Sequence, residues 1–549
     1  MSPDGSTACW RRRPQVSACR EGDNLILFDP DAGREKVVNR AGHAVWDAMD
    51  GAARTEDLAQ ALARRYDVPL TEAIRADAAE FAEELRRDGF AETLHAPAPV
   101  PLPPEDCSEL KEAPRNFDLS LTGRCNLHCA YCFYADEMVG RADLPADRWK
   151  AFFAELKTLA VRGLTLSGGE VFLRPDLWEL VDALIDGRMR YSLLTNGTLI
   201  TDKTVGELMR EGRRRRLDSI QVSIDGSCAA VHDASRGNGS FERALRGLRL
   251  LKAAGLPVTA RVTVNQHNVD DLERAVRLLL DDVGLARVGT NDAMPMGTGC
   301  AHRQEVVLTP AQRVTAMDTL VRLEREYPGR IQASAGSLAL WHMFREMEEA
   351  RATGLKTRRW KMGCLSSCGC MFAKLAVHHD GMIVPCNMLA AASLGRIGET
   401  PIRSIWQDHP LLVDMRRRGR IPMEQVPGCK DCEWAPYCSG GCPAAEYTRT
   451  GEMNVANPEC CYRKFLQETG DRGQETGDRR QGTGDRRQEA GDRRQGTGDR
   501  GQEAGDRRQG RSRRWHKRLK SWLCIRRPMI WRCGYLKPVK AFRRKSGMR

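Results

Sequence analysis

Short apolar strands alternate with amphipathic helices from about residue 117 to residue 289, and this alternation limits the possible folds. Most of the expected strands end in glycine, asparagine or another small polar residue. Repeated βα units of this length predict a parallel sheet whose ligand-binding loops share one rim. The expected strands are 117–121, 163–167, 191–195, 219–224, 258–264 and 286–289. The expected helices lie near 145–160, 176–186, 202–211, 240–254 and 270–281.

The loop after the first expected strand carries three closely spaced cysteines. Residues 125–132 read Cys-Asn-Leu-His-Cys-Ala-Tyr-Cys, which places thiols at Cys125, Cys129 and Cys132. Three thiolates at this spacing can hold three irons of a 4Fe–4S cluster and leave the fourth iron without a protein ligand. An open iron is a place where a substrate or cosubstrate binds. On these cysteines alone, a zinc knuckle or a disulfide framework remains the alternative.

Further motifs follow the cysteines in a fixed order, and through them the chain resembles the radical S-adenosylmethionine (SAM) superfamily. The residues that carry the resemblance are Cys125, Cys129, Cys132, Tyr131, Gly168, Gly169, Glu170, Thr195, Asn196, Gly197, Ser223, Asp225 and Gly226. The resemblance implies an α/β fold with a partial (β/α)6 TIM-type barrel. It also implies that one electron from the reduced cluster cleaves SAM, and that the resulting 5′-deoxyadenosyl radical abstracts a substrate hydrogen.

The same resemblance implies a role for each of these residues around SAM. Gly168 and Gly169 would let the backbone approach the methionine moiety closely. Glu170 would bind the ammonium group of that moiety, and Tyr131 would pack on the adenine. Donors and acceptors for the ribose and the carboxylate would come from Thr195, Asn196, Ser223 and Asp225.

A second group of cysteines lies near the C-terminal end of the chain, which contains 20 cysteines in all. They are spaced as Cys364-x5-Cys370-x15-Cys386, then Cys429-x2-Cys432-x5-Cys438-x3-Cys442, then Cys460 and Cys461. On spacing alone, a zinc ribbon is the alternative. The fuller pattern resembles the SPASM extension of peptide-modifying radical SAM enzymes.

The SPASM resemblance implies two auxiliary 4Fe–4S clusters. The first would be held by Cys364, Cys370, Cys386 and Cys442, and the second by Cys429, Cys432, Cys438 and Cys460. The spacing favours Cys460 over Cys461 as the last ligand, although the sequence leaves that choice open. Residues 379–386 predict a hairpin that turns at Gly381 and delivers Cys386. Asn387 stands where sulfatase-maturing relatives have an Asp base, which argues against sulfatase maturation.

The first hundred residues form a different module. Two short strands at 24–29 and 36–39 precede three helical segments, the second of which is expected to have Thr55 as its N-cap. This winged-helix-like pattern resembles the PqqD-type recognition domain, which implies binding of a leader peptide as a strand added to a sheet edge. The alternatives are a small packing domain or a DNA-binding winged helix. Five acidic residues between 72 and 84 argue against DNA.

These patterns divide the chain into seven parts. The expected parts are a PqqD-like domain at 15–95, a proline-rich linker at 96–114, a radical SAM barrel at 115–300, a helical connection at 301–362, a SPASM domain at 363–466, a disordered repeat at 467–510 and a basic tail at 511–549. The linker would let the front domain present a tethered substrate to the barrel at high effective concentration.

The net charge of +13 comes from the C-terminal tail. Residues 511–549 contain 15 Lys and Arg and no acidic residue, whereas residues 467–510 are neutral, which leaves residues 1–466 near −2. The neutral segment repeats Gln-x-x-Gly-Asp-Arg-x six times without an apolar position, so a coiled coil is excluded and disorder is expected. A tandem expansion without function is favoured over an interaction tail for lipid or RNA. Nucleic acid is not an expected partner.

The complete pattern predicts an enzyme of the cytoplasm. The sequence has no apolar run of 18 residues and no signal peptide, so no membrane span is expected. The expected substrate is a ribosomally made precursor peptide, which would gain a crosslink or thioether, with a flavodoxin or ferredoxin as reductant. The first alternative is a maturase of a protein side chain or a tetrapyrrole. The second is an iron–sulfur electron-transfer or peptide-binding protein without radical chemistry.

Overall fold

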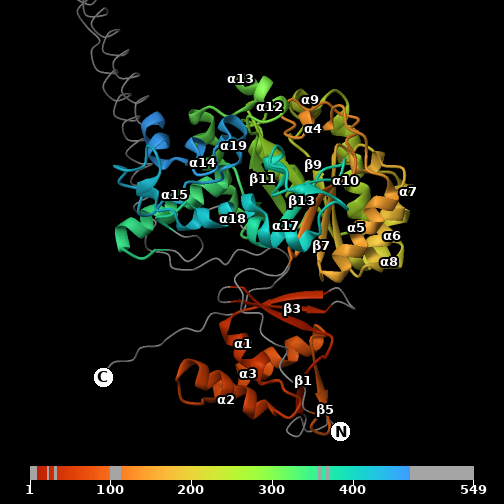
Figure 1. Ribbon diagram of the computed structural model, residues 1–549, viewed down its shortest axis with the longest axis vertical. Coiled ribbons are helices and arrows are strands. Elements are labelled where there is room, and N and C mark those ends of the chain that lie inside the picture. The colour runs from red at the N-terminus through yellow and green to blue at the C-terminus, as the bar shows by residue number, and fades with distance from the viewer. Residues whose placement is uncertain are drawn as a thin grey trace, which may run out of the picture. The chain divides into compact units, whose positions relative to one another are not determined.

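The structure is a computed structural model that describes residues 9–21, 24–29, 34–98, 113–356, 362–365 and 370–469 (Figure 1). Most of the expected linker lies outside these residues, as do the repeat beyond residue 469 and the whole basic tail. The predictions for those segments therefore stay predictions.

The N-terminal domain combines antiparallel strands with three helices. One sheet has the order β2 (Ser17–Glu21), β3 (Asn24–Asp29), β4 (Arg34–Val38). A second pair joins β1 (Cys9–Arg12) to β5 (Ala91–Leu94). The helices are α1 (Arg40–Ala48), α2 (Thr55–Tyr66) and α3 (Glu72–Arg87). The two expected strands correspond to β3 and β4, whereas β1, β2 and β5 were not expected.

Local hydrogen bonds fix where these helices begin. The side chain of Asn39 accepts from the N–H groups of Ala41 and Gly42 at 3.1 and 2.9 Å, which caps α1. The prediction of Thr55 as a cap was wrong by one residue, because α2 has Arg54 at its N-cap. Each helix buries an apolar face in one core. Its members include Leu25, Leu27, Val45, Trp46, Met49, Leu58, Leu62, Ile74, Ala78 and Leu85.

The central sheet confirms the predicted parallel barrel. Its parallel strands are β6 (Asn116–Ser120), β7 (Gly163–Ser167), β8 (Arg190–Thr195), β9 (Leu217–Ser223), β10 (Val258–Val264) and β11 (Val288–Asp292). These strands are neighbours in chain order, as a partial (β/α)6 barrel requires. A further short strand, β12 (Ile331–Ala333), extends the parallel order beyond β11.

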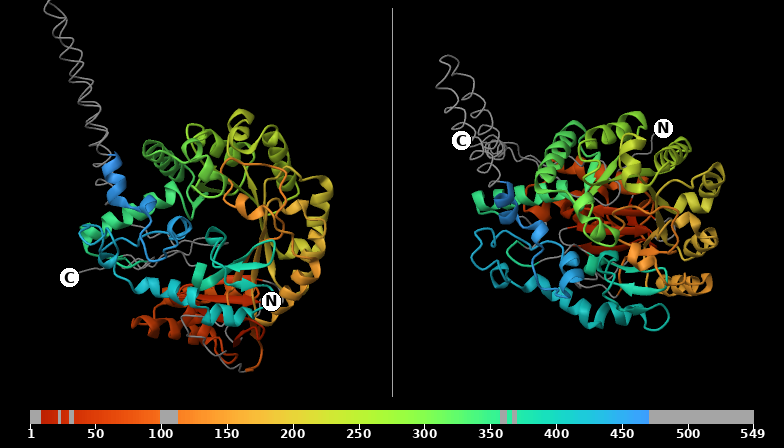
Figure 2. Two further views of the ribbon diagram at one scale, coloured as in Figure 1. Left: turned by 45° about the horizontal axis from the view of Figure 1, so that its top comes forward. Right: turned by 90° about the horizontal axis from the view of Figure 1, so that it is seen from above.

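Helices cover the outer side of this sheet, as the yellow and green segments of Figure 2 show. They are α5 (Ala146–Thr158), α6 (Leu177–Asp186), α7 (Asp202–Met209), α8 (Glu211–Arg216), α9 (Ala229–Arg236), α10 (Ser240–Ala253) and α11 (Leu272–Arg277). The short helices α8 and α9 were not expected. After β11 come α12 (Thr298–Ala301), α13 (Arg303–Val306), α14 (Pro310–Glu326) and α15 (Ser337–Thr353).

The C-terminal cysteine-rich region begins by extending the barrel sheet. Strand β13 (Lys374–Val377) pairs in parallel with β6, and β14 (Met382–Val384) and β15 (Gly395–Arg396) follow in antiparallel order. The expected hairpin is confirmed: Gly381 has φ +86° and donates its N–H to the carbonyl of His378 at 2.9 Å. The short helix α16 (Cys370–Ala373) precedes β13, and the short helices α17 (Ile402–Asp408), α18 (Pro410–Arg417) and α19 (Ala444–Thr450) follow β15.

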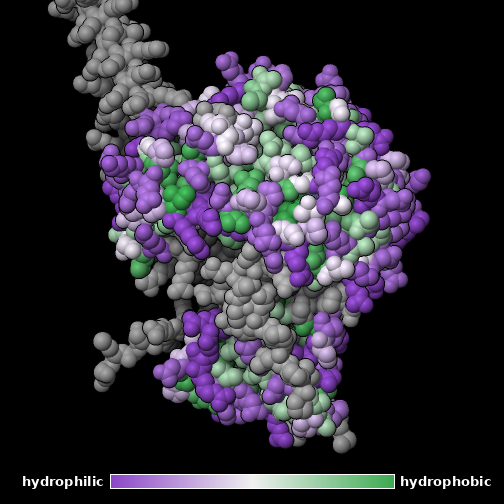
Figure 3. Space-filling model, in the orientation of Figure 1, coloured by the Kyte–Doolittle hydropathy of each residue, from purple (hydrophilic) through white to green (hydrophobic). Residues whose placement is uncertain are grey.

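One hydrophobic core runs from the barrel into this region. It joins Phe117 of β6, Trp149 and Phe152 of α5, Val377 of β13 and Trp406 of α17, all buried. Burying each large side chain contributes roughly 1.5–3 kcal/mol. The face of the molecule in Figure 3 is covered mostly by hydrophilic side chains. Among the described residues, no helix combines the length and the apolar character needed to cross a bilayer.

Candidate functional site

The cysteine loop leaves the end of β6 and is held against the loop after β7 by backbone contacts. The N–H of Gly169 donates to Thr122 O, and that of Glu170 donates to Arg124 O, both at 2.8 Å. A Cβ on Gly168 would lie 2.4 Å from Thr122 O, and one on Gly169 would lie 2.3 Å from Arg124 O. Both positions therefore need glycine for the close approach of the two loops.

The three thiols of this loop influence one another. Burial raises the pKa of Cys125, Cys129 and Cys132, in the last case to about 11. Cys129 also raises the pKa of the other two, so its thiol lies near both of them. A thiol binds iron as the thiolate. Iron would take the place of the proton on each thiol, and its positive charge would offset the free-energy cost of burying three thiolates close together. The three thiols therefore fit an iron–sulfur cluster.

Glu170 joins the ends of β7 and β8. Its carboxylate, 1% exposed, accepts from Thr195 Oγ1 and from the N–H of Asn196, both at 2.7 Å. It also accepts from the N–H of Phe172 at 3.3 Å. Burial raises the pKa of Glu170, and these donors oppose the shift. The structure thus shows Glu170 bracing two strand ends, while its contact with the SAM ammonium stays a prediction.

Asn196 connects the end of β8 to the cysteine loop. Its side-chain amide donates to Asn126 Oδ1 at 2.9 Å, and its oxygen accepts from the hydroxyl of Thr198 at 2.7 Å. Asn126 in turn donates to Thr198 Oγ1 at 2.8 Å. The three side chains form a closed ring of hydrogen bonds directly after Cys125. Asn196 therefore positions the loop that carries the thiols.

Asp225 forms a buried ion pair and contacts the cysteine loop through Tyr131. Its carboxylate, fully buried, accepts from Arg236 Nε at 2.5 Å, from the N–H of Thr263 at 2.8 Å and from the Tyr131 hydroxyl. The Arg236 guanidinium lies 5.6 Å from the centre of the Tyr131 ring and lowers the pKa of Cys129 against the effect of burial. The predicted cofactor residues Tyr131 and Asp225 are thus paired with each other and with Arg236.

Sequence reasoning missed Arg236 and Thr298. Arg236 is the last residue of α9, a helix that was not expected. The sequence marked this position only by an arginine directly before Gly237. Thr298 begins α12, and its hydroxyl donates to the carbonyls of Cys129 and Cys132 at 2.9 and 3.3 Å. Its N–H donates to Cys132 O at 3.1 Å. The glycines on either side of Thr298 were the available signal for a close approach.

The strand ends gather the predicted residues of the SAM site at one rim. The cysteine loop contacts the ends of β7, β8 and β9 through Gly169, Asn196 and Asp225 respectively. Ser223, partly exposed, ends β9 two residues before Asp225. The predicted residues therefore converge where a barrel places its active site.

The auxiliary cysteines occupy loops of the C-terminal region. Burial raises the pKa of Cys438 to about 11, and Cys461, Cys429 and Cys432 raise it further. Cys364 lies in a segment bridged to Pro422. The side chain of Cys370 is outside the described residues, and the grouping of Cys364, Cys370, Cys386 and Cys442 stays a prediction. Within the described residues, no three His, Cys, Asp or Glu side chains are arranged to hold a single metal ion.

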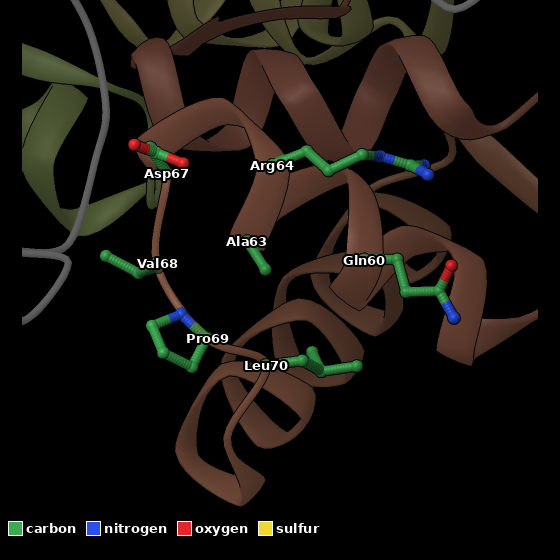
Figure 4. Close-up of a pocket in the computed structure, with 7 residues that line it drawn as sticks. All are labelled: Gln60, Ala63, Arg64, Asp67, Val68, Pro69 and Leu70. Carbon is green, nitrogen blue, oxygen red and sulfur yellow. The ribbon is translucent and has the colours of Figure 1, made fainter.

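A small pocket lies on the N-terminal domain, at the end of α2 (Figure 4). Its lining residues are Gln60, Ala63, Arg64, Asp67, Val68, Pro69 and Leu70. Asp67 has φ +51°, and this turn brings Val68 and Pro69 back toward Ala63. The pocket contains none of the predicted cofactor-binding residues.

Three families match the chain in the order of its domains. Residues 24–91 match coenzyme PQQ synthesis protein D (PqqD), residues 119–279 match the radical SAM superfamily, and residues 368–433 match the SPASM iron–sulfur cluster-binding domain. The AdoMet-dependent heme synthase of Methanosarcina barkeri is 31% identical over 364 residues, which are 64% of this chain and 98% of the relative.

Other relatives carry peptide-related names. The PqqA peptide cyclase of Ruegeria pomeroyi is 28% identical over 62% of this chain and 85% of its own length. The mycofactocin maturase MftC of Mycobacterium ulcerans is 28% identical over 64% and 88%. The crystal structure of Streptococcus suis SuiB bound to precursor peptide SuiA has the same fold, with a TM-score of 0.56, 14% identity, and coverage of 82% and 99%.

The chain belongs to the radical SAM superfamily. It is a radical SAM enzyme with a SPASM domain and, at its N-terminal end, a PqqD domain. Its cofactors are SAM and 4Fe–4S clusters. The second alternative considered from the sequence, a protein without radical chemistry, is thereby set aside.

Proposed function

We propose that this enzyme modifies a ribosomally made precursor peptide, and that the front domain captures the leader of that peptide. The observation that carries the proposal is the presence in one chain of a PqqD domain, a radical SAM barrel and a SPASM domain. Relatives named as a peptide cyclase and a maturase match 62% and 64% of this chain. A crosslink or thioether is the expected product.

The residues of the barrel rim would place SAM and keep the loop rigid. When bound, the reduced cluster and SAM supply one-electron chemistry that removes a hydrogen atom from a substrate. Cys125, Cys129 and Cys132 would hold that cluster. The braces through Glu170 and Asn196 fix the strand ends around it, so that the reacting groups meet at a defined distance.

The sheet of the front domain supplies a means to hold a leader. In the order β2-β3-β4, the strands β2 and β4 each pair on one side only within the described sheet. An extended peptide can add to such an edge through main-chain hydrogen bonds, with side-chain pockets for specificity. When residues 15–95 hold the leader, the effective concentration of the core peptide at the barrel should rise.

Anaerobic assays of the reconstituted full-length enzyme test this proposal. With dithionite, SAM and a precursor peptide encoded nearby, we expect 5′-deoxyadenosine and a peptide lighter by two hydrogens. In a crosslink, one hydrogen leaves as an atom, and the second leaves as a proton whose electron passes to an auxiliary cluster. A peptide without its leader should be a poor substrate. Formation of 5′-deoxyadenosine without any change in every nearby candidate peptide would contradict the peptide assignment.

A tetrapyrrole is the second candidate substrate, because the 31% identical relative is named a heme synthase. The same assay separates the two candidates. A tetrapyrrole substrate should change its absorption spectrum in step with 5′-deoxyadenosine formation, and leader peptide should not compete. The peptide proposal predicts no spectral change and strong dependence on the leader.

We also propose an electron donor and a compartment, because both must suit the oxygen-sensitive cofactors. A low-potential flavodoxin or ferredoxin would deliver the electron that starts each turnover. Iron–sulfur assembly favours a reducing cytoplasm. Replacing dithionite with reduced flavodoxin in the same assay should sustain 5′-deoxyadenosine formation.

A further inference from the structure

The parallel strands of the barrel have two different faces. On β10, every second residue from Val258 to Val264 belongs to the hydrophobic core, so Arg261 points to the opposite side of the sheet. Helices cover the core side (Figure 2), and we call the opposite side the inner face. The inner face is mostly polar and only partly buried. Its members include Thr165, Ser167, Ser192, Ser219, Gln221, Ser223, Thr259, Arg261 and Asn291.

The strands β6 to β11 and β13 carry three basic side chains, and two of these are paired with acids. Lys374 Nζ lies 2.6 Å from Asp118 Oδ2, and Arg190 is paired with Asp218. Burial lowers the pKa of Arg261, and no acidic neighbour among the described residues opposes that shift. Arg261 is therefore the one basic side chain of these strands that has no counter-charge within the described part of the chain.

One hydrogen bond and one glycine set the position of the Arg261 guanidinium. Its Nε donates to Gln221 Oε1 at 2.7 Å. Gln221 pairs with Thr259, two residues before Arg261, so the side chain leans toward the N-terminal ends of the strands. Arg261 pairs on its other side with Gly289, where a Cβ would lie 3.6 Å from Nη2. Glycine at this position leaves one side of the guanidinium uncovered.

The two terminal nitrogens of Arg261 are available to a ligand. Neither Nη1 nor Nη2 has a hydrogen-bond acceptor among the residues that the structure describes. A guanidinium presents its N–H groups in a plane that matches the two oxygens of a carboxylate. A charged group that is partly removed from water is costly unless it is paired. The chemistry of this position therefore fits a carboxylate that is supplied by a ligand.

We propose that Arg261 binds a carboxylate of the peptide that the enzyme modifies. This carboxylate comes from an Asp or Glu side chain of the core peptide or from its C-terminal residue. Gln221 is a positioning residue that orients the guanidinium. The side chain leans away from the rim that holds the predicted SAM residues, which favours the peptide over the carboxylate of SAM as the ligand. The inference rests on the proposed function and names a chemical feature of its substrate.

Protection from arginine-selective labelling tests whether the peptide covers Arg261. The full-length, anaerobically reconstituted enzyme is treated with phenylglyoxal alone, with SAM, or with a precursor peptide encoded nearby, and mass spectrometry locates the labelled arginines. The peptide should prevent most of the labelling of Arg261, and SAM should not. Arg214, exposed on α8, is the control whose labelling should stay constant. Unchanged labelling of Arg261 with the peptide, or protection by SAM alone, would overturn the proposal.

A double-mutant cycle identifies the carboxylate. Arg261→Gln should lower kcat/KM for the peptide about 10- to 100-fold, with iron content and SAM affinity unchanged, whereas Arg214→Gln should have no effect. Peptides with single Asp→Asn or Glu→Gln changes, and one with a C-terminal amide, distinguish the two sources. The peptide that lacks the bound carboxylate should lose the same factor with the native enzyme and nothing further with Arg261→Gln. Losses that multiply, or native rates with every altered peptide, contradict the proposal.

The two experiments separate this proposal from the proposed function. If the native enzyme modifies the peptide while Arg261 stays unprotected, only the role of Arg261 is contradicted. If the native enzyme binds the peptide at Arg261 without modifying it, the proposed function fails and the binding site stands. If neither protection nor modification is found, both are contradicted.

Discussion

At the level of single residues, the cysteine loop depends on side chains and glycines that would not bind the cluster themselves. Gly169 gives the loop room, Asn196 closes a ring of hydrogen bonds around Asn126, and Asp225 anchors Tyr131 from below. These residues hold the backbone of the cysteine loop in its position. Changes in them should therefore affect cluster assembly or protein stability before they affect the chemical step.

Replacement of Gly169 by alanine should disrupt the SAM-binding cluster. The new Cβ would lie 2.3 Å from Arg124 O and 2.9 Å from the Cβ of Cys125, and backbone cannot give way as a flexible side chain can. We expect loss of about one third of the iron, measured after reconstitution. Gly206→Ala in α7 is the matched control, because nothing lies within 4 Å of its Cβ. Full iron in Gly169→Ala would refute the steric argument.

Replacement of Asp225 by asparagine should destabilise the barrel by about 3–5 kcal/mol. The substitution leaves the buried Arg236 guanidinium without its carboxylate, and both side chains are less than a tenth exposed. Thermal unfolding measures the effect. A double variant, Asp225→Asn with Arg236→Gln, should recover part of the loss. A change below about 1 kcal/mol in the single variant would mean that the pair is weakly coupled.

His232 should make stability depend on acidic pH. Burial lowers the pKa of this fully buried histidine to about 4, and its Nδ1 accepts from the N–H of Asp225 at 3.0 Å. Below pH 6.5 the unfolded chain binds a proton that the folded chain does not, so stability falls as pH drops from 6.5 toward 4. The cost is about 2 kcal/mol between pH 7 and pH 5.

Comparison with His232→Asn isolates this effect, since asparagine keeps an acceptor without the titration. Denaturant unfolding at pH 7 and pH 5 should show a smaller pH dependence in the variant than in the native enzyme. Equal pH dependence in both proteins would assign the titration to other groups.

At the level of elements, two segments remote in sequence meet the cysteine loop. The turn that begins α12 binds the carbonyls of Cys129 and Cys132 through Thr298. The β13–β14 hairpin places His379 Nδ1 2.9 Å from the Tyr134 hydroxyl. The loop is thus held from the far end of the barrel and from the SPASM region at once.

Replacement of Thr298 by valine should weaken SAM binding while the thiols keep their iron. Valine conserves the shape but leaves two carbonyls of the cysteine loop without the hydroxyl, at a cost of about 1–3 kcal/mol. Equilibrium binding of SAM to the reconstituted enzyme measures the effect, with Thr298→Ser as the control that retains the donor. Unchanged affinity in the valine variant would show that the loop is rigid without this contact.

The elements that sequence patterns could predict are the long periodic ones. Strands β7 and β10 were expected with their observed bounds, because apolar residues and flanking glycines mark them. Strand β12 was not expected, because its three residues are too few for an alternating pattern. Helices α8 and α9 were not expected either, because six and eight residues span only about two helical turns and hold too little helical periodicity. In the site, motif order predicted which loops converge. The Asp225–Arg236 pair could not be predicted, because tertiary burial decides it.

For the whole molecule, the cysteine sets divide between a barrel and a SPASM region that share one core. Each set lies in its own loops, so the clusters should assemble independently. The charge is divided in a different way: the basic tail at 511–549 carries +15, more than the net charge of +13, whereas residues 1–466 are near −2. The cysteines expected to bind clusters and the excess of positive charge therefore lie in different segments of the chain.

Replacement of Cys125 by alanine should abolish SAM cleavage without emptying the auxiliary sites. Loss of one of three thiolates leaves the SAM-binding cluster poorly held. We expect no 5′-deoxyadenosine and retention of about two thirds of the iron, with the auxiliary signals still present in the spectrum of the reduced enzyme. Loss of all iron would mean that the clusters assemble cooperatively.

The parallel pairing of β13 with β6 has a consequence for how such enzymes are recombined. The strand that delivers the cysteine loop is hydrogen-bonded on one side to its own barrel and on the other to the SPASM region. A chimera that exchanges the SPASM region at the sequence boundary would also exchange the strand beside the reaction centre. In a grafting experiment, residues 374–384 should therefore be kept with the barrel whose strand β6 they contact, and the exchange should begin after them. The same restriction applies to the exchange of these domains in evolution.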